Sequence, residues 1–218
     1  WTMPSKLPAL EYGSVTYADD KELFVALSTT GEAISFKLTD LNLNYTIGDI
    51  PVGRWSSVAY SNEIQRFVAL SYAGPTGAIY SDDGVHWNPS ELQKNPWSKV
   101  LWIPSIDQFI AVANTGEHNV FASPDGITWT EQDTEGGYWR DLAWAPSLNM
   151  FTIVSSAYEI NNASSTNGIS FTEYKSSRLS SIQWSDELQT FVAQVVPNNI
   201  DFVEENQNVA VGKEITPT

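Results

Sequence analysis

The chain has 218 residues, of which 26 are acidic and 11 are basic, so its formal net charge is −15 and it contains no cysteine. An acidic surface repels phosphate groups, so the sequence predicts neither a nucleic acid nor an anionic membrane as a partner. The lack of cysteine excludes disulfides, thiolate metal sites and cysteine catalysis. No apolar run approaches the roughly 18 residues that a membrane-spanning helix needs.

In chain order, the sequence begins with Trp1, which precedes Tyr12 by nearly the same distance as Trp87 precedes Trp97. We therefore interpret residues 1–5 as the outer strand of the last unit of a repeat, which would close a ring by pairing the two chain ends. The alternative is a frayed N-terminal tail.

A repeat follows, and its clearest mark is an aromatic residue, six intervening residues and then phenylalanine. The five phenylalanines lie 40 to 43 residues apart. The five pairs are Tyr17/Phe24, Tyr60/Phe67, Trp102/Phe109, Trp144/Phe151 and Trp184/Phe191. A period of this length with four strand-sized segments is typical of one blade of a β-propeller.

The repeat divides the chain into units of similar length, with short apolar runs rich in β-branched and aromatic residues and turn formers between them. No window has a helical period with caps. The units are 10–53, 54–96, 97–138, 139–177 and 178–218 together with 1–5. The sequence therefore predicts one all-β domain over residues 1–218: a five-bladed β-propeller with four-stranded antiparallel blades, closed by the N-terminal strand.

Units two to four carry a second motif, which we call the box turn. In unit two it reads Ser81-x-Asp83-Gly84-x-x-Trp87. We expect the aspartate to accept hydrogen bonds from its own turn, the glycine to adopt a positive φ, and the tryptophan to pack over the turn and between blades. The other copies are Ser123, Asp125, Gly126 and Trp129, and Ser165, Asn167, Gly168 and Phe171.

Catalytic and metal chemistry find little support in the sequence. The two histidines, His86 and His118, are predicted on opposite faces, so they would not share a metal ion. A glycosidase needs two facing carboxylates, but Asp141 is the one acid at the start of an inner strand. We therefore predict no catalytic residues, no metal and no cofactor.

The loops between the second and third strands, opposite the box turns, form the expected ligand face. Aromatic rings can stack there on a sugar, and amides can bind its hydroxyls. The candidate residues are Tyr72, His118, Tyr158 and Asn198. Arg140, together with Arg54 and Arg178, falls at the start of an inner strand. These arginines could hold an anionic sugar over the central axis; alternatively, they are solvated charges, and the loop residues are ordinary exposed side chains.

The box turn resembles the Asp-box of the sialidase-like β-propellers, whose pattern is Ser-x-Asp-x-Gly-x-x-Trp. This chain lacks the residue between Asp83 and Gly84. In that family the box is structural and lies away from the ligand face, so the resemblance implies a fold and not sialidase activity. Sialidases look six-bladed and use an arginine triad, whereas this chain has five units and four arginines.

The chain is also similar in composition and motif to repeat propellers in tail and fibre proteins of bacterial viruses. That resemblance implies a non-catalytic module, located in a virion or outside the cell, that contacts other virion proteins or recognises a cell-surface glycan of the host. The alternatives are a free sugar-binding lectin of similar length and a glycoside hydrolase.

Overall fold

The computed structural model describes residues 7–37, 44–115, 117–134, 137–157, 162–174, 178–196 and 209–212. This part of the chain consists of five antiparallel sheets and two single-turn 3-10 helices, η1 (Pro104–Ile106) and η2 (Pro146–Leu148). Neither of these helices has the length or the apolar character needed to cross a membrane.

Each sheet is built from strands that follow one another directly in the sequence. The first sheet contains β1 (Tyr12–Ala18), β2 (Leu23–Ser28), β3 (Glu32–Phe36) and β4 (Tyr45–Asp49). The second contains β5 (Arg54–Ser61), β6 (Arg66–Ala73), β7 (Ala78–Ser81) and β8 (Asn88–Pro89). The third contains β9 (Trp97–Ile103), β10 (Gln108–Ala113), β11 (Val120–Ser123) and β12 (Thr130–Glu131). The fourth contains β13 (Trp139–Ala145), β14 (Met150–Ser155), β15 (Asn162–Ser165) and β16 (Thr172–Tyr174). The fifth contains β17 (Leu179–Ser185), β18 (Thr190–Val195) and β19 (Val209–Gly212).

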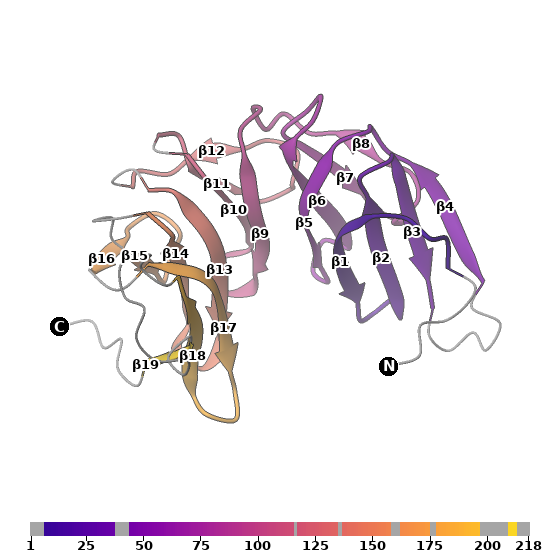
Figure 1. Cartoon of the computed structure of the whole chain (residues 1–218). Coiled ribbons are helices and arrows are strands. Elements are labelled where there is room, and N and C mark those ends of the chain that lie inside the picture. The colour runs from indigo at the N-terminus through magenta and orange to yellow at the C-terminus, as the bar shows by residue number, and fades with distance from the viewer. Residues whose placement is uncertain are drawn as a thin grey trace, which may run out of the picture.

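The five sheets follow one another around an arc, with β1, β5, β9, β13 and β17 on its inner side and the first and fifth sheets at its two ends (Figure 1). The prediction of an all-β chain with four-stranded antiparallel sheets is confirmed for the first four sheets, and the described part of the fifth has three strands. The predicted closing strand, residues 1–5, lies outside the described residues, so ring closure stays a prediction.

Neighbouring sheets pack face to face through the phenylalanine of the repeat. Phe67 of the second sheet is fully buried in a cluster with Val25 and Leu27 of the first. Phe109 of the third sheet likewise packs on Leu70 of the second. The fourth and fifth sheets repeat this contact. At each of these four interfaces the phenylalanine face of one sheet therefore meets an aliphatic face of the sheet before it.

The residue that opens most inner strands is a large aromatic, which we call the anchor. Trp97 is fully buried, and its indole N–H donates to the carbonyl of Gln93 at 2.9 Å. Trp55 donates in the same way to Pro51, also at 2.9 Å. In the second and third sheets the anchor thus fixes the incoming segment four residues before it, because its buried indole N–H needs an acceptor.

The box turns join the third and fourth strands, and their hydrogen bonds follow one scheme. The Asp83 carboxylate accepts from the backbone N–H of Val85 and of His86, both at 2.8 Å, while the Ser81 hydroxyl accepts from the N–H of Gly84 at 2.8 Å. The glycines at the three turns have φ between 71° and 77°. The same contacts recur at the second turn, and at the third the Asn167 amide oxygen replaces the carboxylate.

These hydrogen bonds determine how the turns respond to acid. Partial burial by itself would raise the pKa of Asp83, but the donated hydrogen bonds from His86, Val85 and Ser81 outweigh it and lower the pKa. The pKa of Asp125 is lowered for the same reason, with burial again opposed by bonds from Ile127 and Thr128. Both carboxylates therefore stabilise the fold above the ordinary aspartate pKa of about 3.9, and this stability is lost as the pH falls below it.

We expect the Asp83→Asn/Asp125→Asn variant to lose less stability than the unaltered chain between about pH 5 and pH 2, because asparagine keeps the acceptor oxygen but does not titrate there. Urea-unfolding midpoints across this range measure the effect, with Asp133→Asn, an exposed residue away from the box turns, as the control. Equal acid sensitivity of all three chains would contradict the assignment.

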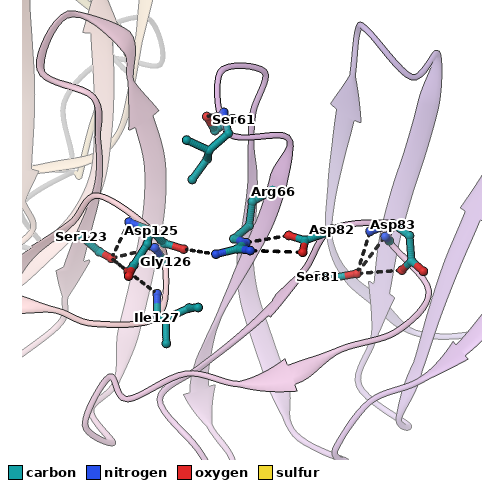
Figure 2. A network of polar contacts seen from close by, with 11 residues as sticks. Ser61, Arg66, Ser81, Asp82, Asp83, Ser123, Asp125, Gly126 and Ile127 are labelled. Carbon is teal, nitrogen blue, oxygen red and sulfur yellow. Dashed lines mark hydrogen bonds and ion pairs between the residues drawn. The ribbon is translucent and has the colours of Figure 1, made fainter.

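Arg66 joins the box turns of two neighbouring sheets (Figure 2). Its guanidinium donates to both carboxylate oxygens of Asp82, at 2.7 and 3.1 Å, and to the carbonyl of Asp125 in the next sheet at 3.0 Å. Its Cζ also lies 4.9 Å from the centre of the Tyr80 ring. One side chain thus connects the second and third sheets at the rim.

Arg66→Lys is expected to lower the free energy of unfolding by about 1 kcal/mol, because an ammonium cannot make the two parallel bonds to Asp82 and also reach Asp125. Denaturant unfolding provides the measurement. The double variant Arg66→Lys/Asp82→Asn separates the loss of the ion pair with Asp82 from the loss of the bond to the Asp125 carbonyl. A lysine variant as stable as the unaltered chain would show that the bridge contributes nothing.

Candidate functional site

Every inner strand is irregular at the residue that follows its anchor, or that follows Leu179 in the fifth sheet. There the pairing with the second strand skips one residue, so that each inner strand contains a β-bulge. A bulge turns the side chain of the extra residue away from its ordinary direction. The five bulged residues line one common pocket where the inner strands begin, on the axis of the arc; they are Gly13, Ser56, Ser98, Arg140 and Ser180.

Serine at the bulge connects the second inner strand to the third and the third to the fourth. The Ser56 hydroxyl donates to the carbonyl of Trp97, the anchor of the following sheet, at 2.7 Å. Ser98 makes the same bond to Trp139 at 2.7 Å. Both hydroxyls still have lone pairs that can accept a hydrogen bond from a ligand.

Glycine and arginine replace serine in the first and fourth sheets. A Cβ on Gly13 would lie 2.2 Å from the carbonyl oxygen of Trp55, so the first two inner strands approach each other too closely for any side chain. Arg140 stands at the same place in β13 and is exposed. One guanidinium therefore reaches the pocket because arginine replaces serine at this position of the repeat in the fourth sheet.

The pocket, which we call the axial pocket, has a volume of about 430 Å³. Volumes of about 300 to 1,000 Å³ are typical of sites for small ligands. It opens at the end of the sheets opposite the box turns, since Thr29 and Tyr72 contribute to it from the ends of the second strands. Its lining is completed by Arg54 and Trp55.

The axial pocket is positively charged although the chain as a whole is acidic. Arg54 and Arg140 both line it, and no carboxylate is among the lining residues in the described part of the chain. The Arg54 guanidinium lies over the Tyr72 ring, with Cζ 4.9 Å from the ring centre. Within the described residues neither guanidinium forms an ion pair with a carboxylate. Both charges are therefore available to an anionic ligand.

The structure brings together only some of the residues that the sequence proposed for binding. Tyr72 and Arg140 line the axial pocket. His118 lies in the loop between β10 and β11, where its Nδ1 is 2.6 Å from a carboxylate oxygen of Glu131, and it is not among the residues that line this pocket. Tyr158 and Asn198 lie outside the described residues.

Arg178 and Asp141, the other candidates near the starts of inner strands, form hydrogen bonds with backbone groups of the chain itself. The Arg178 Nε donates to the carbonyl of Ser156 at 2.6 Å, and Arg178 is absent from the pocket lining. Asp141 accepts hydrogen bonds from the backbone N–H of Leu142 at 2.9 Å and of Ile182 at 3.0 Å, so it joins the fourth and fifth inner strands. Arg178 therefore holds the start of the fifth inner strand to the end of β14, and Asp141 joins two inner strands.

The bulge serines were not proposed from the sequence, although a signal for them exists. The dipeptides Trp55-Ser56 and Trp97-Ser98 repeat in phase with the anchors. A repeated small polar residue beside a buried aromatic indicates a fixed structural place, but only the bulge shows that this place is on the axis. No group of three histidine, aspartate or glutamate side chains suited to a metal ion occurs among residues that the structure describes.

No protein family matches the sequence, and neither does any curated protein. Solved structures do match. A structure titled "YCF48 bound to D1 peptide" has a TM-score of 0.60 and 12% identity over 85% of this chain and 60% of its own. Hydrazine synthase from Kuenenia stuttgartiensis has a TM-score of 0.70 and 10% identity over 97% of this chain and 64% of its own.

The chain has a β-propeller fold. Its sheets are therefore the blades that the 40- to 43-residue period predicts. The β-propeller spans less than two thirds of the length of either matching chain. At 10% and 12% identity these likenesses show the fold alone.

Proposed function

We propose that this chain is a non-catalytic β-propeller module of a phage virion, part of a tail or fibre, and that its axial pocket binds an acidic glycan of the host surface. The observation that carries the binding proposal is the pair of arginines, Arg54 and Arg140, in a pocket whose described lining contains no carboxylate. Guanidinium groups bind carboxylates through two parallel hydrogen bonds. The axial serines supply hydroxyl partners of the kind that a sugar needs.

The assignment to a virion rests on the acidic, cysteine-free composition and on the repeated box turns, which are similar to those of tail and fibre propellers. Such a module would contact other virion proteins as well as a glycan. Antibodies raised against the chain should label purified particles of a phage that encodes it. Labelling of the host culture fluid alone, without particles, would instead support the free lectin.

Binding is favoured over glycoside hydrolysis by the placement of the acids. A glycosidase needs two carboxyl groups on either side of the scissile bond. Asp141 is bonded to two backbone N–H groups, and the described lining of the axial pocket contains no acid. Release of sugar from a fluorogenic glycoside by the purified chain would contradict this assignment.

The binding proposal is tested with the fluorescently labelled chain and an array of glycans arranged in pairs, each acidic glycan beside its neutral or reduced counterpart. We expect signal on the carboxylated members only, and competition by the free acidic sugar. Binding to both members of each pair would show a neutral-sugar lectin. Because the YCF48 structure contains a peptide, peptides with a free and with an amidated C-terminus are included, and binding to the free form alone would replace the glycan with a peptide carboxylate.

A further inference from the structure

The first blade has a phenylalanine face that no other described sheet covers. Two rows of apolar side chains cross all four strands on this face, in register from β1 to β4. The rows are Tyr17, Phe24, Phe36 and Tyr45, and Val15, Ala26, Ile34 and Ile47. Val15, Ile47, Tyr17 and Tyr45 are 61%, 50%, 44% and 37% exposed, whereas Ala26 and Ile34 at the centre are buried. The segment from Leu7 to Leu10 lines a cavity together with these two central residues. We call the eight residues of the two rows the outer face of the first blade.

The outer face has the same composition and register as the faces that are buried inside the molecule. In the second blade, Tyr60 pairs with Phe67, and Val58 pairs with Ala69 and Ile79 across the strands. These five side chains pack against the first blade. Phe67, Phe109 and Phe151 are fully buried, whereas Phe24, at the equivalent place in the first blade, keeps part of its surface exposed.

The segment that leads into the first blade also matches an internal one. Tyr12 donates its hydroxyl to the carbonyl of Pro8, four residues earlier, at 3.0 Å, as Trp97 does to Gln93. Five residues before the anchors of the second and third blades is an aliphatic residue, Ile50 or Leu92, and Leu92 is buried between these two blades. Leu7 has the same place before Tyr12, but it is only half-buried and lines an apolar cavity of about 370 Å³ over the outer face.

The opposite end of the arc has a polar face instead. In β18, Gln194 pairs with Ser181, and Val192 pairs with Gln183. Gln194 is exposed and stands where the other blades have a buried aliphatic residue such as Leu70 or Val112. Repeat proteins carry a polar outer surface on a terminal repeat. The fifth blade has such a surface and the first blade does not.

We propose that the outer face of the first blade is the docking surface for one further blade of the same repeat, which presents to it an aliphatic face like that of the second blade. The basis is continuity with four established interfaces: at each of them a phenylalanine face meets an aliphatic face. Exposed apolar side chains that gather on one sheet face, as Val15, Ile47 and Tyr17 do here, mark a site of association. The polar face of the fifth blade is a poor match, because docking there would bury two glutamine side chains.

A single thiol provides the test, since the chain contains no cysteine. Ile47→Cys places it on the outer face, and Leu188→Cys, at a residue 62% exposed in the turn after β17, is the control. The further blade is supplied as a second copy of residues 54–86 fused directly before Trp1, so that Trp1 follows the added copy as Trp87 follows residue 86. We expect the thiol introduced by Ile47→Cys to react with a thiol reagent as fast as the control in the unextended chain, and about tenfold or more slower in the extended one.

A matched extension carries Val68→Asp and Leu70→Asp in the added copy, which removes its aliphatic face. It should leave the reaction at residue 47 fast. Fast reaction in the extended chain, or equal protection by both extensions, would overturn the proposal. A lack of amide-exchange protection in the added strands would also overturn the proposal. The reason is that residues 54–86 fold in the second blade, where an aliphatic face and a phenylalanine face flank them.

The unextended chain gives an independent result. Val15→Thr/Ile47→Thr should leave its unfolding midpoint and its molecular mass in solution nearly unchanged, because these side chains are 61% and 50% exposed there and threonine keeps the β-branched shape. A slow thiol at residue 47, a loss of stability or a dimer that this variant dissociates would show that another part of the chain or a second copy already covers the outer face, and the proposal would then be wrong.

Discussion

The Arg54→Gln/Arg140→Gln variant is expected to lose at least about 100-fold in affinity for an acidic glycan, and each single variant about 10-fold, which is about 1.4 kcal/mol for each guanidinium. The two arginines are the charged groups that line the axial pocket in the described part of the chain. Glutamine keeps hydrogen-bond donors but removes the charge, so the loss reports the charge-assisted part of the interaction.

Isothermal titration with the sugar found on the array measures these affinities. Lys21→Gln is the matched control, because it removes one positive charge from the turn between β1 and β2, at the box-turn end of the first blade. The arginine variants should keep the unfolding midpoint of the unaltered chain, since both side chains are exposed. If all variants bind equally well, the glycan does not occupy the axial pocket.

Arg54→Gln should weaken binding for a second reason that does not apply to Arg140→Gln. The Arg54 guanidinium lies over the Tyr72 ring, 4.9 Å from its centre, and this contact fixes the direction of the charge. Tyr72→Leu is therefore expected to reduce affinity in the unaltered chain but to add little to Arg54→Gln. Additive losses would show that Tyr72 contacts the sugar independently of Arg54.

Trp97→Ala is expected to produce the largest loss of stability, about 3–5 kcal/mol. Its side chain is fully buried between the second and third blades, contacts Phe121 edge-on with ring centres 5.5 Å apart, and donates to the Gln93 carbonyl. Alanine leaves a cavity where two sheets meet and releases the segment that precedes β9. Denaturant unfolding followed by the fluorescence of the remaining tryptophans gives the free energy.

Tyr12→Ala provides the matched comparison. It removes the anchor of the first blade, which makes the same bond four residues back, but this side chain is 39% exposed. We expect a loss of about 1 kcal/mol, which corresponds to the hydrogen bond. A loss as large as that of Trp97→Ala would mean that the outer end of the first blade is already covered. Addition of the further blade should bring the two losses closer together.

Much of the fold can be read from the sequence because the repeat encodes it locally. The aromatic–phenylalanine pairs lie directly opposite one another in the hairpins, as Tyr17 and Phe24 do in β1 and β2, with ring centres 4.5 Å apart. A turn such as Ser81 to Trp87 is closed by hydrogen bonds among its own residues. Each of these contacts joins residues near in sequence, so their spacing alone predicts them.

The residues of the ligand site could be predicted less well from local sequence spacing. The sequence points to Tyr72 and Arg140, but another loop candidate, His118, bonds to Glu131 and lies outside the axial pocket lining. The site is assembled from bulges on five inner strands, and one residue from each strand gives no contiguous motif. The direction of the side chain at Ser56 or Ser98 depends on the skipped pairing in the ladder, which no local pattern of residue types reveals.

The sequence by itself determined the strands, the box turns and the number of repeats, because these follow from residue spacing and from hydrogen bonds within a turn. Only the tertiary structure decided which side chains meet on the axis and which sheet face is left uncovered. The reason is that both depend on how whole sheets are placed against one another. The same Phe face is buried in the second blade and open in the first, and no residue type distinguishes Phe24 from Phe67 until their neighbours are in place.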